Sequence, residues 1–183
     1  MDSTGVTDET ALVSAAKAGD EQAFETLVRA HVDAVYGHAL RFFGDPTAAE
    51  DATQEVFIKM FRSLESFDGR AALSTWLFRV TRNVCLDIAR SRKHIPTPVD
   101  IADVDPPRSA DAADAVALAD AVEKAVRTLP PEERDALSAV AIFDLPYDEA
   151  AEVLGVPVGT VKSRVFRARK ALATLLAEPG KEA

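Results

Sequence analysis

Cysteine is almost absent from the chain. Cys85 is the single one, so neither an intrachain disulfide nor a cysteine-cluster metal site can form. Long apolar runs are also missing, because none approaches the roughly 20 residues that a membrane-spanning helix needs. The first residues are acidic and lack the basic-then-apolar order of a signal peptide. We therefore expect a cytoplasmic protein with no direct membrane insertion, in which Cys85 is a small hydrophobic core residue.

Basic residues are also few relative to acidic ones. The 21 Lys and Arg residues are outnumbered by 30 Asp and Glu residues, which gives a formal net charge of −9. This balance argues against a protein that coats nucleic acid without sequence preference. The apolar content of 48% is nevertheless enough for a buried core.

Features of an enzyme are missing too. The sequence shows no nucleophile paired with a base, no glycine-rich phosphate loop and no carboxylates clustered on one inward face. His31 and His38 do not belong to a metal-ligand pattern, and each is interpreted as a surface or half-buried residue. We therefore predict a protein that is not an enzyme and that has no metal, no cofactor and no small-molecule substrate.

Strand-like alternation and internal repeats are absent, and helical periodicity runs through most of the chain. Residues 95–120 break it, because four prolines interrupt any helix and six aspartates face a single arginine. We expect an all-α fold in which an N-terminal helical bundle (9–94) is joined by a flexible acidic linker (95–120) to a C-terminal helix-turn-helix domain (121–178). Residues 1–8 are expected to form a frayed tail. The expected helices cover 9–18, 21–43, 47–64, 74–92, 121–129, 132–143, 147–154 and a last helix that ends near 177.

The stretch 155–172 is an exception in this acidic chain, because it holds five basic residues and no acidic one. Its apolar residues recur at the spacing of a helix packed by one side. The outward face combines cations with an exposed aromatic, which suits phosphates and base edges in a major groove. A short helix (147–154) and a turn at Gly155 precede it, as in a helix-turn-helix. The alternative is a basic surface on an ordinary helical hairpin.

Two further surfaces stand out. On the helix at 47–64, the outer side carries Asp51, Gln54, Glu55 and Ile58, while Phe61 is placed on the buried side. An acidic and amide patch with one aliphatic residue indicates protein docking, although a solvated face is the alternative. On the helix at 74–92 the outer side is basic and includes one amide, and Trp76 points inward. This face is either a second nucleic-acid surface or a solvated one.

Four stretches together resemble one family. They are residues 49–57 (AEDATQEVF), 74–83 (STWLFRVTRN), 129–134 (LPPEER) and 159–169 (GTVKSRVFRAR). In this order they are similar to bacterial RNA polymerase sigma factors of the small, two-domain extracytoplasmic-function (ECF) group of the sigma-70 family. The resemblance covers roughly 20–94 and 121–175. It implies a subunit that binds core RNA polymerase and directs promoter-specific initiation of transcription.

The resemblance also implies roles for particular residues. The contact with the clamp helices of the polymerase's largest subunit would be made by Asp51, Gln54, Glu55 and Ile58. Melting of the minus-ten element, with a flipped base held by the loop, would involve Asp68, Gly69, Arg70, Ser74, Arg79, Arg82, Asn83 and Arg90. Reading of the minus-thirty-five element in the major groove would involve Thr160, Lys162, Ser163, Arg164, Phe166, Arg167 and Lys170.

The implied partners are core RNA polymerase, including the flap of its second-largest subunit, promoter DNA and an anti-sigma factor. The competing interpretation is a helix-turn-helix regulator whose N-terminal helices dimerise or sense a ligand. A dimerisation domain does not need a basic face bearing Asn83, so the sigma factor is favoured. We further hypothesise that the aspartates of 95–120 compete with DNA for the basic faces of the free protein.

Overall fold

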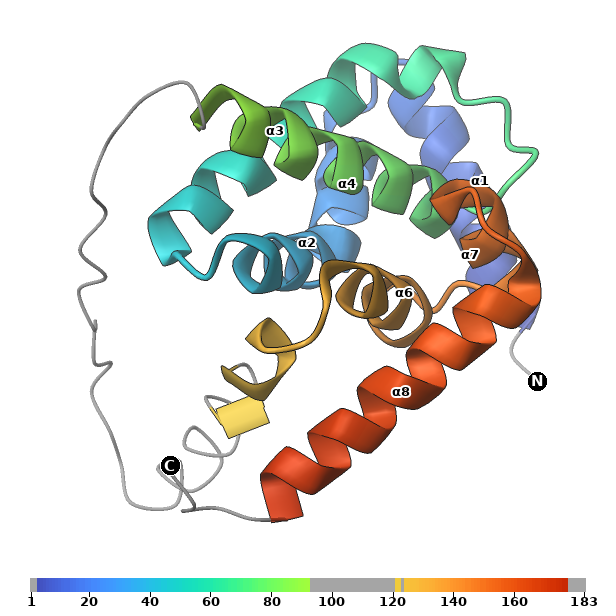
Figure 1. Ribbon diagram of the computed structural model, residues 1–183. Coiled ribbons are helices and arrows are strands. Elements are labelled where there is room, and N and C mark those ends of the chain that lie inside the picture. Colours follow the sequence, from blue (N-terminus) through green and yellow to red (C-terminus); the bar gives the residue numbers. More distant parts are fainter. Residues whose placement is uncertain (1–2, 93–120, 123, 178–183) are drawn as a thin grey trace, which may run out of the picture.

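The computed structural model describes residues 3–92, 121–122 and 124–177, and within them it contains helices and no strand. The N-terminal helices are α1 (Ser3–Lys17), α2 (Glu21–Phe43), α3 (Pro46–Ser63) and α4 (Leu73–Arg92), with a short 3₁₀ turn at Leu64–Ser66 (Figure 1). The C-terminal helices are α6 (Pro131–Ala141), α7 (Tyr147–Leu154) and α8 (Val158–Ala177). Residues 121–122 and 124–127 are helical too. The predicted all-helical fold is confirmed, whereas the expected linker at 95–120 lies outside the described residues.

Side chains and glycines set the helix ends where the sequence predicted them. Asp20 caps α2 by accepting hydrogen bonds from the backbone N–H groups of Gln22 and Ala23. Asp45 caps α3 in the same way, with Pro46 at the first helical position. Gly155 ends α7 in the left-handed conformation, at φ 67°. The boundaries of α2, α3 and α7 therefore follow from local chemistry.

Among the helix boundaries that differ from the sequence prediction, those at the start of α1 and the end of α6 change the most. Helix α1 begins at Ser3, so most of the expected tail at 1–8 is helical. Helix α6 ends at Ala141 and does not reach Phe143. There the chain turns at Asp144, which has φ 53°, and the N–H of Leu145 donates to the carbonyl of Ala139 at 3.0 Å. This turn directs Phe143 and Leu145 inward, where both are buried.

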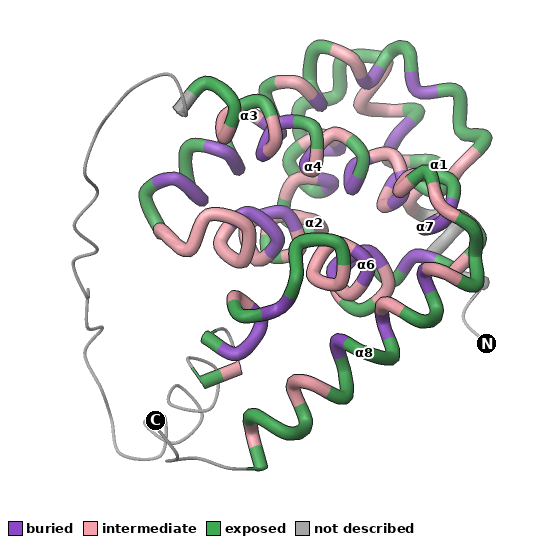
Figure 2. Tube along the Cα trace, in the orientation of Figure 1, coloured by how far each residue is buried: buried purple, intermediate pink, exposed green. Residues whose placement is uncertain are grey.

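The four N-terminal helices surround one apolar core (Figure 2). Helix α2 packs against α1, α3 and α4, and α3 also packs against α4. The core is filled by Leu27, Val56, Met60 and Leu77, all almost completely buried. Cys85 is buried among them, as predicted, and its burial raises the pKa of the thiol to about 12.

The C-terminal helices form a second unit. Helix α8 lies along α6 and α7, and it buries Val161, Val165 and Ala168 of the predicted stripe, whose fourth residue, Leu172, is half-buried. Ala150 and Ala151 of α7 are buried as well, so small residues allow α7 to approach its neighbours closely. This is the packing that a helix-turn-helix requires.

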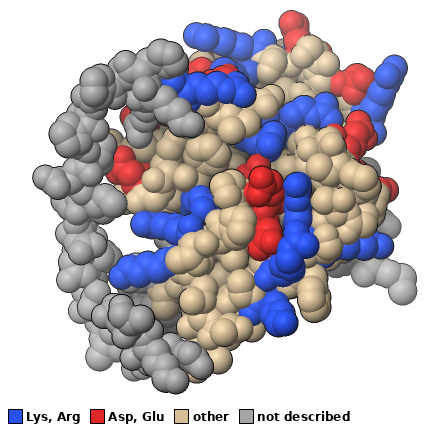
Figure 3. All heavy atoms as spheres, in the orientation of Figure 1, with Lys and Arg blue, Asp and Glu red and all other residues tan. Residues whose placement is uncertain are grey.

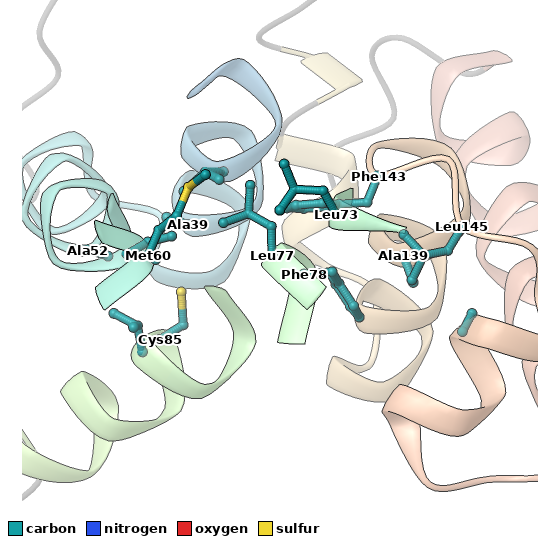
Figure 4. Close-up of a cluster of buried hydrophobic side chains, with 14 of the residues drawn as sticks. Ala39, Ala52, Met60, Leu73, Leu77, Phe78, Cys85, Ala139, Phe143 and Leu145 are labelled. Atoms are coloured by element: carbon teal, nitrogen blue, oxygen red, sulfur yellow. The ribbon is translucent and has the colours of Figure 1, made fainter. Parts of the chain in front are cut away.

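The two units share a continuous core (Figure 4). The ring of Phe143 lies 5.1 Å from the ring of Phe78 on α4 and 6.1 Å from the imidazole of His38 on α2, measured between centroids. His38 is 2% exposed, so its interpretation as a surface or half-buried residue was wrong. It was missed because its burial depends on Phe143, which is remote in the sequence. His31 is half-buried beside Glu9, at 3.1 Å.

Arg134 of α6 ties the units together through backbone carbonyls. Its guanidinium donates to the carbonyl of Arg41 at the end of α2 at 3.0 Å, and also to the carbonyls of Arg127 and Leu129 at 2.8 and 3.0 Å. The side chain is half-buried, and burial lowers its pKa. Three carbonyl acceptors offset the cost of removing this cation from water.

None of the helices described is long and apolar enough to cross a membrane. The same residues contain no cluster of three or more His, Cys, Asp or Glu side chains that could hold a metal ion.

Candidate nucleic-acid and docking surfaces

The outer side of α3 carries the predicted docking residues. Asp51, Gln54 and Ile58 are exposed and Glu55 is half-exposed, so all of them are accessible to a partner. Ile58 is an exposed large aliphatic residue beside carboxylates. An apolar centre with a charged rim is the anatomy of a protein interface.

The structure extends this patch beyond the prediction. Phe61 was expected on the buried side of α3, but its side chain is 69% exposed, so that prediction was wrong. Its ring contacts the ring of Phe24 on α2 edge-on, with centroids 5.3 Å apart. These rings, with Phe57 and Ile58, line a shallow groove of about 580 Å³. Helical periodicity alone did not reveal the groove, because Phe61 lies at the edge of the apolar side.

The loop between the 3₁₀ turn and α4 is held in a tight conformation by its own residues. The carboxylate of Asp68 accepts from the backbone N–H of Arg70 at 3.1 Å and pairs with its guanidinium at 3.2 Å. Gly69 between them has φ 73°, a conformation that other residues rarely adopt. All three residues are exposed, and Ser74 just beyond them is half-buried. The loop is thus pre-shaped and accessible.

A pocket of about 470 Å³ opens beside this loop, between residues 67–73 and α1. Lys17 of α1 donates a hydrogen bond to the carbonyl of Phe67, and its ammonium lies 5.7 Å from the centre of the Phe67 ring. Thr10 and Ser14 of α1 line the same pocket. The contribution of α1 was not predicted, because nothing in the sequence of α1 indicates that it packs against a loop fifty residues away.

The outer face of α4 carries the predicted cations, but part of it is occupied. Asn83 is exposed, and Arg90 is exposed and paired with Asp87 at 3.2 Å. Arg82 donates from its Nε to the carboxylate of Asp135 on α6 at 2.9 Å, and Arg79 lies 3.8 Å from the carboxylate of Glu152 on α7. The α4 face therefore combines an open part around Asn83 with a part that faces the C-terminal unit.

The recognition side of α8 is open to solvent. Phe166 is 68% exposed, and Lys162, Ser163 and Lys170 are exposed too. Thr160 and Arg164 are half-buried at the flanks. The ammonium of Lys162 lies 5.8 Å from the centre of the Tyr147 ring, which connects α8 to the start of α7. Five of the seven predicted residues, including Arg167, are thus exposed on this side of α8, and Thr160 and Arg164 lie at its edges.

Arg167 has a partner that the sequence did not suggest. Its Nε donates to the carboxylate of Glu133 on α6 at 2.6 Å. Guanine is read by two parallel donors, which the two terminal nitrogens of a guanidinium can supply. A bond at Nε therefore restricts the orientation of the side chain without using those nitrogens.

Family models match both units. Sigma-70 region 2 matches residues 27–95, and Sigma-70 region 4 matches residues 119–172. From here on, region 2 refers to the N-terminal unit and region 4 to the C-terminal unit.

Similar proteins cover most of the chain. The ECF RNA polymerase sigma factor SigM of Mycobacterium tuberculosis is 40% identical over 165 residues, which cover 90% of this chain and 83% of the relative. SigW of Bacillus subtilis, also an ECF sigma factor, is 32% identical, over 85% of this chain and 90% of the relative.

Solved structures agree with these relatives. The sigma factor RpoE in complex with the anti-sigma factor NepR from Bartonella quintana matches with a TM-score of 0.68 and 26% identity, over 86% of this chain and 98% of that chain. A structure of CnrH in complex with the cytosolic domain of CnrY matches with a TM-score of 0.65 and 29% identity, over 93% of this chain and 97% of that chain. The chain therefore belongs to the ECF sigma factors of the sigma-70 family, and it directs promoter-specific initiation of transcription by RNA polymerase.

Proposed function

We propose that the protein docks on core RNA polymerase through the α3 patch, defined as Asp51, Gln54, Glu55, Ile58 and Phe61. The observation that carries this proposal is the exposed apolar groove at Phe61 and Ile58, whose polar lining residues are Gln54 and Arg62. Large exposed aromatics beside charged residues are the usual anchors of protein interfaces. The clamp helices of the polymerase's largest subunit are the proposed partner. In this role the protein works in the cytoplasm and contributes no catalytic group of its own.

We assign the two DNA contacts to separate faces. The loop at residues 68–70 and the α4 face act on the minus-ten element, where the 470 Å³ pocket has room for one flipped base. The exposed side of α8 reads the minus-thirty-five element in the major groove, with Phe166 in reach of a thymine methyl group.

An anti-sigma factor is a further proposed partner. The sigma factor RpoE of Bartonella quintana, which this chain resembles in structure, was solved with the anti-sigma factor NepR. By analogy, this chain is bound by a protein that covers its polymerase-binding surfaces until a signal releases it.

Two equally exposed phenylalanines allow a matched test of the docking surface. Phe61→Ala removes the anchor of the α3 patch, and Phe166→Ala removes an aromatic of similar exposure from α8. We expect the first variant to lose about 2 kcal/mol of affinity for core polymerase, the cost typical of an interface anchor. The second should bind core polymerase normally and lose promoter binding. Pull-down with core polymerase and transcription from a supercoiled promoter library measure the two effects.

If the wild-type protein adds no promoter to those that core polymerase transcribes, the proposed function fails. Equal loss of core binding in both variants would remove the assignment of docking to the α3 patch.

A further inference from the structure

We propose that Glu133 of α6 is the positioning residue that makes Arg167 of α8 read a guanine instead of a phosphate. The two side chains come from different helices and meet through one short hydrogen bond, from Nε of Arg167 to the carboxylate of Glu133 at 2.6 Å. The inference deepens the proposed function and rests on it, because it takes α8 as the helix that reads the minus-thirty-five element. Specificity at one base pair then depends on a residue that acts through Arg167.

An exposed arginine beside DNA has two kinds of target. Phosphates lie along both strands, and half to two-thirds of the hydrogen bonds between proteins and DNA go to phosphates and sugars. A guanine edge is a more demanding target, because it needs two parallel donors aimed at O6 and N7. The side chain of Arg167 is 55% exposed, so packing on its own helix does not fix the direction of the guanidinium. A second contact has to select the target.

The hydrogen bond at Nε is such a contact. A guanidinium is planar and rigid, so fixing Nε restricts where its two terminal nitrogens can point. Neither terminal nitrogen has a hydrogen-bond partner among the described residues, and both stay available to a base. The bond joins two charged groups, which makes it stronger than a bond between neutral ones. Arg167 is therefore oriented before it meets DNA.

Glu133 is itself held firmly. Its side chain is only 14% exposed. It lies in the first turn of α6, where the helix dipole favours a carboxylate. The next residue, Arg134, anchors the same turn through hydrogen bonds to the carbonyls of Arg127 and Leu129. The carboxylate is therefore the fixed partner of the pair, and Arg167 is the one that is guided.

The acid sets Arg167 apart from the other cations of α8. In the part of the chain that the structure describes, Arg167 is the cation of this helix that pairs with an acid. Arg164 and Lys170, one turn to either side, remain suited to phosphates, which carry no sequence information. Figure 3 shows acidic side chains next to basic ones near the centre of the molecular face, where Figure 1 places α6.

The test measures base discrimination by the complete holoenzyme. A promoter recovered from the supercoiled library is prepared with every single base-pair change in its minus-thirty-five element, and binding of each duplex is measured over a series of salt concentrations. Glu133→Ala removes the acceptor. Glu132→Ala removes the same charge from the exposed neighbouring position in the same helical turn, and is the matched control. Glu133→Gln keeps an oxygen that can accept from Nε.

We expect Glu133→Ala to lower the discrimination at one base pair about five-fold, a change of about 1 kcal/mol, and Glu132→Ala to leave it unchanged. The released Arg167 gains a phosphate, so the plot of log binding constant against log salt concentration should steepen by about 0.9. Glu133→Gln should keep most of the discrimination. In an Arg167→Ala background, Glu133→Ala should change nothing further at this base pair.

Circular dichroism checks that the variants are folded. Should Glu133→Ala fail this check, Glu133→Asp replaces it: this side chain keeps the charge but is one methylene shorter, so the same loss of discrimination is expected. The proposal is overturned if the Glu133 variant and the Glu132→Ala control agree at every base pair, or if the Glu133 variant acts equally without Arg167. An Arg167→Ala variant that keeps every base preference would instead contradict the proposed function at this residue, and the inference with it.

Discussion

His38 is the least conventional residue of the core. It is surrounded by the rings of Phe42, Phe78 and Phe143, and neither of its ring nitrogens has a hydrogen-bond partner among the described residues. Its pKa is lowered to about 4, mainly because burial disfavours the charged imidazolium; Asp135 acts to raise the pKa, and the guanidinium groups of Arg82, Arg41 and Arg134 act to lower it. The folded protein therefore holds a neutral imidazole between its two regions.

This environment predicts an acid-sensitive core. A histidine with a lowered pKa binds fewer protons when folded than when unfolded, so its contribution is favourable above pH 6.5 and is lost as the pH falls towards about 4. At a pH of about 5 the wild-type protein should have lost about 2 kcal/mol of unfolding free energy through this group. His38→Leu should lose correspondingly less between neutral pH and that value. Urea unfolding at both pH values measures the difference, and parallel losses in the two proteins would contradict it.

At the scale of the element, the turn between α7 and α8 depends on Gly155. Its φ of 67° is left-handed, and a Cβ added there would meet no atom within 4 Å. The glycine is therefore required by backbone conformation and not by crowding. Gly159, in the first turn of α8, also has open space around it but lacks a positive φ.

The two glycines predict opposite effects of the same substitution. Gly155→Ala should cost about 1 kcal/mol, because an L side chain is strained in the left-handed region. Gly159→Ala should be neutral or stabilising by up to about 1 kcal/mol, because alanine restricts the unfolded chain and favours the helix. Thermal unfolding of both variants provides the comparison. A stabilising Gly155→Ala would show that the turn does not adopt this conformation.

The helices also show how much of the fold could be predicted from the sequence. Asp20, Asp45 and Gly155 predicted helix ends, because capping and left-handed turns depend only on near neighbours. The outward side of α8 was predicted because one buried stripe determines the opposite face. The exposure of Phe61 and the burial of His38 were predicted wrongly, since both depend on elements distant in sequence. For the same reason, the pairing of Arg82 with Asp135 had no local signal.

At the scale of the whole molecule, the two regions pack against each other. Their shared core, the Arg134 carbonyl contacts and the Arg82–Asp135 ion pair connect them through three different kinds of interaction. Docking on polymerase must offset the free energy of all three if both DNA faces are to be used. The apparent affinity for polymerase is therefore the intrinsic affinity multiplied by the fraction of molecules in which the two regions have separated.

Because the two regions must separate before both can bind, variants that weaken their contact should change the affinity for complete core polymerase but not the affinity for a fragment that binds region 2 alone. The double variant Asp135→Asn with Glu152→Gln, which weakens the ion pairs between the regions, should bind complete core polymerase about five-fold more tightly than the wild type, because less free energy is needed to separate the regions and engage region 4. It should bind an isolated clamp-helix fragment with unchanged affinity, because the α3 patch is accessible while the two regions are packed together. Titration of a labelled protein with each partner measures both. Tighter binding to the fragment would mean that the packing of the two regions also covers the α3 patch.

Helix α6 has a consequence for the exchange of domains between relatives. It carries Glu133, which orients Arg167 within region 4, and Asp135, which pairs with Arg82 of region 2. A hybrid factor built from region 2 of one protein and region 4 of another keeps the Arg167–Glu133 pair, because both residues lie in region 4. The Arg82–Asp135 pair forms only if both parents carry a matching residue. Such hybrids would differ in how firmly the two regions pack together, even when each half recognises its own promoter element. The two regions are thus modular in the DNA that they recognise and interdependent in how they pack against each other.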